Sequence, residues 1–345
     1  MKKIVRDSNF ELLRIVCMLM IIGGHIIMNH RNVYDFHNMN FPISLFLKGS
    51  FAVAVNAFVL ISGYWGIRFK WSRLLKIDMQ TVFYSIVLLV VAIMLGWHTI
   101  DFRYDFLLLF PVLFKQYWFI TCYVVLYLIS PLLNQWSKSL EKNRYKSLLV
   151  YGALIVYLWP TINFLFNASQ FIDDAGYGII NFIYLYMLGM YLSHHYVDRY
   201  SVWTYWTGYV ISVVLLFFAQ YGLSWILGFE FSSWISYNTM FVFVGSLCLF
   251  LVFKNMHFSS SWVNTVAKPC FAVYLIHLHP CVWKHFCEAI SVSSYHGCQY
   301  ILLIVFLPFV IYAICAFLES VRVMLLGKVE DSLSVFVERR IMKQS

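Results

Sequence analysis

The sequence predicts an all-α integral membrane protein, a bundle of about ten membrane-spanning helices. Of its 345 residues, 61% are hydrophobic and only 12% are charged, and the mean hydropathy is +0.74. That composition is too apolar for a soluble globular protein. Apolar runs of roughly 17–22 residues recur along the chain, each long enough to cross a hydrocarbon core of about 30 Å. The runs are continuous rather than alternating, which favours helices over a β-barrel.

Ten such runs define the predicted spans, and no repeat, low-complexity tract or soluble segment interrupts them, so residues 1–345 are expected to form one domain. The spans cover residues 12–28, 48–66, 77–97, 117–135, 147–165, 178–193, 204–220, 235–253, 268–286 and 299–318. The opening MKKIVR resembles the start of a signal peptide, but no small-residue cleavage site follows Ile22. The first run is therefore expected to be a retained span.

The basic residues predict the orientation of these spans. With a cytoplasmic N-terminus, 20 of the 25 Lys and Arg residues face the cytoplasm and the other 5 face outward, as the positive-inside rule requires. We therefore expect a multi-pass protein of the inner or plasma membrane with both termini in the cytoplasm. The net charge of +9 then reflects topology and attraction to anionic lipid headgroups, rather than nucleic-acid binding.

The first span contains two residues that are rare in lipid, Arg14 and His25. Eleven residues at about 100° each end about 20° beyond three full turns, so both side chains lie on one helix face, separated along the axis by about 16 Å. Alone, Arg14 is equally well explained by snorkelling to headgroups, and His25 by an interhelical hydrogen bond. Together they suggest a site with a phosphate-binding guanidinium at one end and a general base at the other. Acyl-coenzyme A has a matching shape, with a charged nucleotide end, an extended arm and a thioester tip.

This first span resembles that of the acyltransferase 3 family of integral membrane acyltransferases. The shared pattern is a basic residue, ten intervening residues and a histidine, here Arg14 through His25, preceded by Asn9, Leu12 and Leu13. The ten predicted spans and cytoplasmic ends agree with the family architecture as well.

Three later segments resemble the family in the same order along the chain. They are VNAFVLISGYWG (55–66), YWFITCYVVLYLISPLL (117–133) and FAVYLIHLHP (271–280). The residues that carry these similarities are Ser62, Gly63, Tyr64, Trp118, Phe119, Tyr123, Tyr127, Pro131, Tyr274, Leu275 and His277. The resemblance therefore extends over essentially the whole chain.

The resemblance implies transfer of an acyl group, most often acetyl, from cytoplasmic acyl-CoA to a hydroxyl of a surface polysaccharide or lipid-linked glycan precursor. Acyl-CoA would be a donor substrate, and no permanently bound cofactor is expected. His25 would be the catalytic residue, either as the base that deprotonates the acceptor hydroxyl or as a transient acyl carrier. Arg14 and Arg73 would bind the coenzyme phosphates. In the family's R-x-x-R pair the first Arg is replaced here by Lys70, which is a further candidate to hold a coenzyme phosphate as a point charge but lacks the bidentate fork.

Six further residues are candidates to line the substrate site, and each has a structural alternative. Ser62 does not sit in a G-x-S-x-G sequence, so a small residue permitting close helix packing is an alternative to a catalytic role. Asn56 can orient a ligand or join two helices, and the aromatic candidates can line a path or belong to an interfacial belt. His277 has no assigned role, and its spacing from His279 disfavours a metal site, so no metal is expected. The full set is Asn56, Ser62, Tyr64, Trp118, Tyr123 and His277.

A different class of function also fits a polytopic membrane protein, namely a transporter or flippase for lipid-linked sugars. All 16 Asp and Glu residues fall in predicted loops or at span ends, whereas ion-coupled transporters commonly place a carboxylate near the bilayer midplane. This counts against an ion-coupled transporter without excluding a carrier of lipid-linked sugars, which stays the alternative to an acyltransferase. Transfer of another acyl group, such as succinyl, also stays open. The expected partners are acyl-CoA, a glycan acceptor and membrane lipids, with no nucleic acid.

Overall fold

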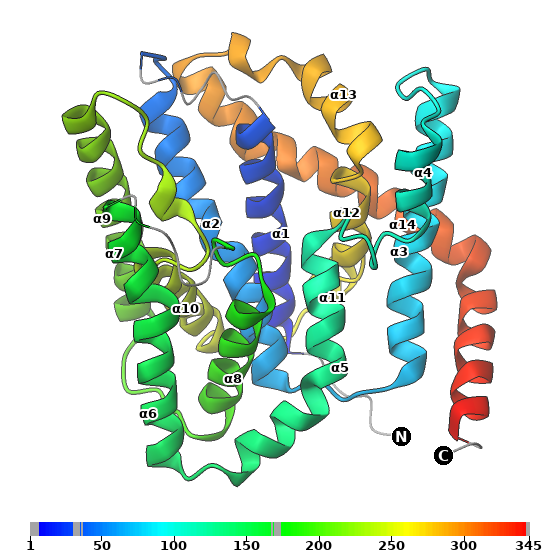
Figure 1. The fold of residues 1–345 in the computed structure, drawn as a ribbon, viewed down its shortest axis with the longest axis horizontal. Coiled ribbons are helices and arrows are strands. Elements are labelled where there is room, and N and C mark those ends of the chain that lie inside the picture. Colours follow the sequence, from blue (N-terminus) through cyan, green and yellow to red (C-terminus); the bar gives the residue numbers. More distant parts are fainter. Residues whose placement is uncertain (1–6, 30–34, 36, 167, 169–173, 343–345) are drawn as a thin grey trace.

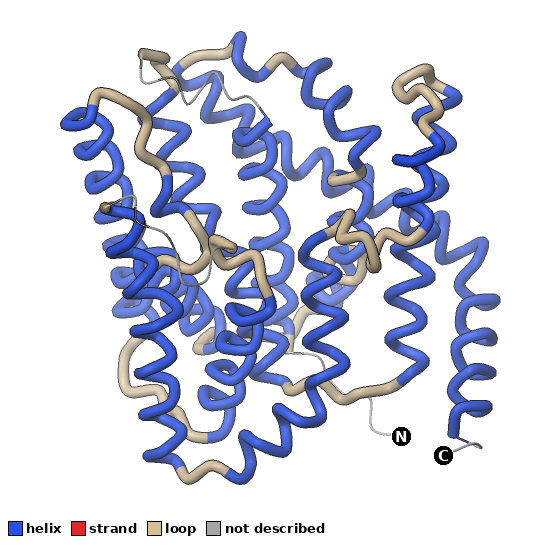
Figure 2. Tube along the Cα trace, in the orientation of Figure 1, coloured by secondary structure: helices blue, strands red, loops and turns tan. Residues whose placement is uncertain are grey.

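The fold was analysed in a computed structural model that describes residues 7–29, 35, 37–166, 168 and 174–342. The described residues form helices joined by loops and turns, with no strand among them (Figure 2). Seven helical segments are long and apolar enough to cross a membrane. The all-α membrane bundle predicted from the sequence is therefore confirmed.

The long segments match seven of the predicted spans, and two shorter apolar helices match two others. Six of the long segments are the single helices α1 (Ser8–Asn29), α2 (Phe41–Trp65), α3 (Trp71–Met94), α5 (Trp118–Ser139), α9 (Val202–Leu227) and α14 (Gly297–Met342). The seventh is a continuous run of α6 (Lys142–Ala153), a π-helical turn (Leu154–Leu158) and α7 (Trp159–Leu165). The shorter helices are α8 (Ile179–His194) and α10 (Met240–Lys254). The remaining α-helices are α4 (Phe102–Leu109), α11 (Ser261–Val266), α12 (Cys270–His277) and α13 (Pro280–Ile290).

The predicted span 268–286 is wrong as a single helix, because the chain divides there into α12 and α13. Pro280 occupies the first turn of α13 and His279 before it is extended, with φ −61° and ψ 124°. A residue before proline is sterically disfavoured in the helical region, which ends α12 at His277. This break leaves the His277 side chain at the end of α12, inside the bundle.

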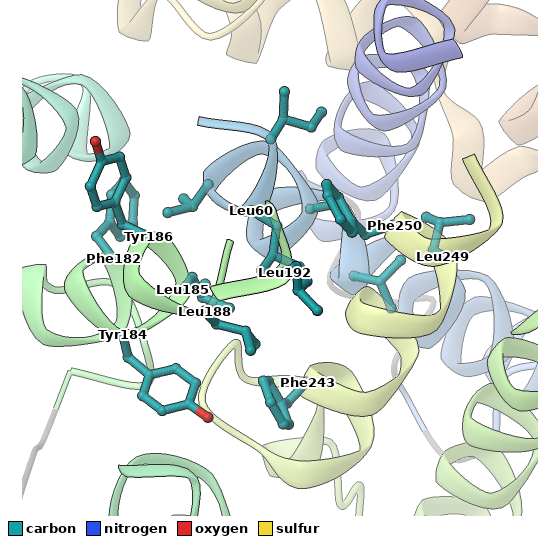
Figure 3. Packing of buried hydrophobic residues seen from close by; sticks show 14 of the residues in the cluster. Leu60, Phe182, Tyr184, Leu185, Tyr186, Leu188, Leu192, Phe243, Leu249 and Phe250 are labelled. Atoms are coloured by element: carbon teal, nitrogen blue, oxygen red, sulfur yellow. The ribbon is translucent and has the colours of Figure 1, made fainter. Parts of the chain in front are cut away.

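Helix α1 stands between two packed groups of helices (Figure 1). Phe10, Leu13 and Cys17 join a buried cluster with residues of α2, α8 and α10. Figure 3 shows part of this cluster, with Leu60 of α2, Leu188 of α8 and Phe250 of α10 among its labelled members. Other α1 residues join a second cluster with α3, α12 and α14. Helix α1 is thus fixed on both sides, which holds its polar residues in defined positions. The start of α1 and the end of α14 lie toward the same end of the bundle (Figure 1).

A buried polar network fixes α3 against α14. Tyr84 donates to a Glu319 carboxylate oxygen over 2.6 Å, and Gln80 donates to the other oxygen over 3.1 Å. Arg322 donates to Glu319 over 2.8 Å and also pairs with Glu330. Buried charges persist when paired in this way, and the pairing fixes the helix that carries Arg73.

Gly63 allows α2 and α8 to pack closely. A Cβ added at Gly63 would lie 2.2 Å from the Tyr186 carbonyl oxygen, and one at Gly189 would lie 2.6 Å from the Leu60 carbonyl oxygen. Small residues are the usual means of close helix approach in membranes. The glycine of the Ser62-Gly63 pair therefore makes this contact.

Replacing Gly63 with alanine is expected to destabilise the bundle by about 1–3 kcal/mol, because the added methyl group overpacks a backbone contact. The thermal midpoint of purified protein in detergent measures the effect. Gly222→Ala in α9 is the matched control, because nothing lies within 4 Å of its added Cβ. An equal midpoint for the two variants would contradict the packing account.

Candidate functional site

A central cavity of about 350 Å³ lies among α1, α2, α3, α5 and α12. Arg14 and His25 both line it, as their shared helix face predicts. Its walls also include Ser62, Trp118 and Tyr123 of the sequence candidates. The complete wall is Arg14, Met18, Ile21, His25, Val55, Phe58, Ser62, Ile77, Trp118, Phe119, Ile120, Tyr123, Tyr237, Ala267, Lys268, Cys270, Phe271 and Tyr274. The cavity is mostly apolar along its length, with basic groups at one end and His25 at the other.

A second cavity of about 380 Å³, which we call the basic cavity, adjoins the Arg14 end of the central cavity. The two share Arg14, Ser62, Ile77 and Tyr123 as wall residues. The basic groups that line the second cavity are Arg14, Arg68, Arg73 and Lys76. Such a cluster of guanidinium and ammonium groups suits a polyanion such as the phosphates of a nucleotide.

A third, small cavity of about 50 Å³ adjoins the His25 end of the central cavity. The wall residues that the two cavities share are Ile21, His25, Val55 and Tyr237. Lys48 and Gly24 also line the small cavity. The three cavities therefore follow one another along α1, with Arg14 at the first junction and His25 at the second. In the predicted orientation, the basic cavity is on the cytoplasmic side and the small cavity toward the outside.

Arg14 is held by an acidic neighbour on its own helix. Its Nη1 donates to Glu11 Oε1 over 2.9 Å, and 35% of the Arg14 side chain is exposed against 8% of the Glu11 side chain. A guanidinium carries further N–H donors beyond those that one carboxylate oxygen engages. Arg14 lines both the central and the basic cavity.

His25 contacts a second imidazole, that of His277. His25 Nδ1 lies 3.1 Å from His277 Nε2, and His277 Nδ1 lies 2.6 Å from the Val273 carbonyl oxygen. The indole of Trp283 packs edge-on against both rings, with centroid distances of 6.4 and 5.6 Å. His277 is buried behind His25 and is not one of the cavity wall residues. The break between α12 and α13 positions it there.

Aromatic side chains form the wall near His25. Trp118 stacks on Tyr237 with a centroid distance of 5.7 Å and an interplanar angle of 23°, and the Tyr177 ring lies 4.5 Å from that of Trp118. Phe119 stacks on Tyr123 one turn away along α5. Tyr237 lines both the central and the small cavity, so this group of rings lies beside the junction of the two.

Asn56 and Tyr64, predicted as substrate-lining candidates, do not line the three cavities. Asn56 is fully buried, donates to the Tyr237 carbonyl oxygen over 2.9 Å and accepts from Asn181 over 3.2 Å. It thereby fixes the backbone of the segment that carries Tyr237. Tyr64 packs against Phe10 with a centroid distance of 5.1 Å. For Asn56 the contact with Asn181 is the alternative role of joining two helices, since Asn181 lies on α8.

Of the wall residues of the central cavity that carry a nitrogen or oxygen in the side chain, three were not predicted as site residues from the sequence. Lys268 lines the basic end of the central cavity, and Tyr237 and Tyr274 line its aromatic part. Tyr274 belongs to the FAVYLIHLHP segment, which provided a signal for it. Lys268 and Tyr237 lie near predicted span ends with no motif around them, so only the tertiary arrangement identifies them.

Lys70 and Arg73 differ in their placement. Arg73 lines the basic cavity, whereas Lys70 does not. The Lys70 backbone N–H donates to the Tyr127 hydroxyl over 2.9 Å, and its side chain is exposed. Lys70 thus shapes the loop before α3, and Arg68 and Lys76 contribute to the basic cavity beside Arg73.

Arg73→Ala is expected to weaken acyl-CoA binding about 10–100-fold, because a charge-assisted hydrogen bond contributes roughly 1.5–3 kcal/mol. Lys70→Ala is the matched control and should change binding less than about twofold, a difference below 0.5 kcal/mol. Binding of labelled acyl-CoA to purified protein measures both. A larger loss in Lys70→Ala than in Arg73→Ala would overturn this ranking.

The histidines near the end of α12 do not converge on one point. His279 Nε2 lies 3.0 Å from the Ser85 carbonyl oxygen, whereas His277 faces His25. In the described part of the chain, no group of three or more His, Cys, Asp or Glu side chains is placed to hold a metal ion.

Comparison with known proteins identifies one family. The acyltransferase 3 family, described as an acyltransferase domain, matches residues 7–320, which is nearly the whole chain. No curated protein and no solved structure matches the chain.

Proposed function

The chain belongs to the acyltransferase 3 family and is a membrane acyltransferase. On this premise, we propose that it transfers an acetyl group from cytoplasmic acetyl-CoA. The acceptor would be a hydroxyl of a surface polysaccharide or of a lipid-linked glycan precursor. The observation that carries the proposal is the series of cavities along α1, with basic groups at one end and His25 at the junction of the central and small cavities.

Two features support acetyl-CoA as the donor, namely the basic side chains at one end of the cavities and the distance along α1 from Arg14 to His25. Arg14, Arg68 and Arg73 border the basic cavity, and Lys268 borders the same end of the central one. The rise along α1 from Arg14 to His25 is about 16 Å, a distance suited to the extended pantetheine arm. The apolar walls between them would hold that arm, and binding sites of this volume, within roughly 300–1,000 Å³, are typical of small-molecule ligands.

The chemistry at His25 would be acyl transfer from sulfur to oxygen. The imidazole takes the proton of the acceptor hydroxyl while that oxygen attacks the thioester carbonyl carbon. One acyl–oxygen bond forms and the acyl–sulfur bond breaks. The proton held by His25 passes to the departing sulfur, which leaves as free coenzyme A. An acceptor entering from the small cavity would meet a donor entering from the basic cavity at this residue.

Reconstitution tests this function. Purified protein in liposomes, supplied with radiolabelled acetyl-CoA and glycan acceptors extracted from the host membrane, should produce labelled glycan and free coenzyme A in equal amounts. Succinyl-CoA in a parallel reaction tests the acyl specificity.

A deletion strain tests the alternative of transport. Loss of acetyl groups from a surface polymer that is still made supports the enzyme. Loss of the polymer itself, with no acyl transfer by the purified protein, would contradict the proposal and support a flippase.

A further inference from the structure

The position of His277 behind His25 determines which nitrogen of His25 is available for chemistry. His277 Nδ1 lies 2.6 Å from the Val273 carbonyl oxygen. A carbonyl oxygen can only accept, so the proton of this hydrogen bond is on His277 Nδ1. In a neutral imidazole the other nitrogen is then an acceptor, which leaves His277 Nε2 with a free lone pair.

The same reasoning continues to His25. His277 Nε2 lies 3.1 Å from His25 Nδ1, and because His277 Nε2 accepts, His25 Nδ1 must carry the proton. His25 Nε2 then has the lone pair. Among the described residues this is the only hydrogen bond of the His25 side chain, and neither ring is bonded to a carboxylate. A charged imidazolium at His277 would lack an ionic partner there, and burying such a charge is costly, so the neutral form is favoured.

We propose that His277 is a positioning residue: by accepting a hydrogen bond from His25 Nδ1, it holds His25 in the tautomer whose Nε2 faces the reactants. The proposal rests on the acyl transfer proposed above. When His25 takes the acceptor proton on Nε2, its Nδ1–H bond to His277 becomes charge-assisted and stronger. His277 therefore stabilises the protonated base without touching the substrate. Its own proton stays on the bond to Val273.

Nitrogen NMR of the purified protein, labelled with ¹⁵N in its histidine rings, tests the tautomer directly. The His25 signals are those absent from the spectrum of His25→Gln. We expect the wild-type signals to report a proton on Nδ1 and none on Nε2 near neutral pH. A wild-type His25 with its proton on Nε2 would overturn the proposal. This readout does not depend on activity, so it separates failure of the inference from failure of the proposed function.

Kinetics of His277 variants provide the second test. His277→Ala should lower kcat about 10–100-fold, the usual cost of removing an orienting partner, and leave the KM for acetyl-CoA unchanged because the Arg14 end is intact. His277→Gln should recover much of the rate, because its amide oxygen can accept from His25 and its NH₂ group can donate to Val273.

His279→Gln is the matched control, since this buried histidine bonds to the Ser85 carbonyl instead of His25. It is expected to keep kcat within about twofold of wild type, less than 0.5 kcal/mol. A His277→Ala protein with wild-type kcat would refute the positioning role. If the His277→Ala protein does not fold, NMR spectra of the wild-type and His277→Gln proteins still test the positioning role. A fully active His277→Gln protein in which His25 no longer carries its proton on Nδ1 would also refute that role.

Discussion

His25→Ala is expected to lower the kcat for acyl transfer by about 10²–10⁴-fold, because it removes the positioned general base. Among the residues that line both the central and the small cavity, His25 is the one with an imidazole. Whether it acts as a base or carries the acyl group, removal of the imidazole eliminates the step. Initial rates of labelled acetyl transfer by purified protein in liposomes measure the effect.

The control for His25→Ala is His257→Ala, which removes an exposed imidazole from the loop after α10. It should retain the wild-type rate. Both variants should insert and elute from size-exclusion chromatography as the wild type does. Undiminished transfer by a correctly folded His25→Ala protein would exclude His25 from the chemistry.

Arg14→Ala is expected to raise the Kd for acyl-CoA about 10–100-fold, because it removes charge-assisted bonds of roughly 1.5–3 kcal/mol at the junction of the basic and central cavities. Maximal turnover at saturating donor should fall much less, since the His25 end is untouched. Arg14→Lys should be intermediate because an ammonium keeps the charge but lacks the fork. Equilibrium binding of a non-reactive acyl-CoA analogue measures the change.

Glu11 requires a specific control in this experiment. Removing Arg14 takes away an ion-pair partner of a nearly buried carboxylate, and breaking such pairs can destabilise a protein on its own. The double variant Glu11→Gln/Arg14→Ala removes that charge. Binding should stay weak in the double variant. Recovery of wild-type affinity there would show that Arg14 acts on Glu11 rather than on the donor.

Much of the fold could be predicted from the sequence because lipid imposes a simple rule. Long apolar runs become helices when water cannot satisfy the backbone, and nine of the predicted spans correspond to helical segments in the structure. The division of the span 268–286 was missed because hydropathy averages over a window and does not register the backbone restriction before Pro280. The HLHP sequence carried that signal.

Spacing along the chain predicted the site only where its residues share one helix, whereas Ser62, Trp118, Tyr123 and Arg73, which also line the cavities, were predicted through the family resemblance. The angle between Arg14 and His25 follows from helical geometry, and both line the central cavity. The contact of His25 with His277 joins residues 252 positions apart, and no local pattern encodes it. Asn56 was a candidate to line the substrate site, but its side chain bonds to Asn181 of α8 and to the Tyr237 carbonyl oxygen instead. These partners depend on how the helices pack, which the sequence does not show. The roles of His25, Arg14, Arg73 and Lys70 stay predictions.

The most direct test of the account is an experimental structure of the protein bound to a non-hydrolysable acetyl-CoA analogue. We expect the nucleotide phosphates beside Arg14 and Arg73 in the basic cavity, the pantetheine arm between Ser62 and Tyr123, and the acyl carbon facing His25 Nε2. A nucleotide bound elsewhere on the bundle, or an acyl group remote from His25, would contradict it.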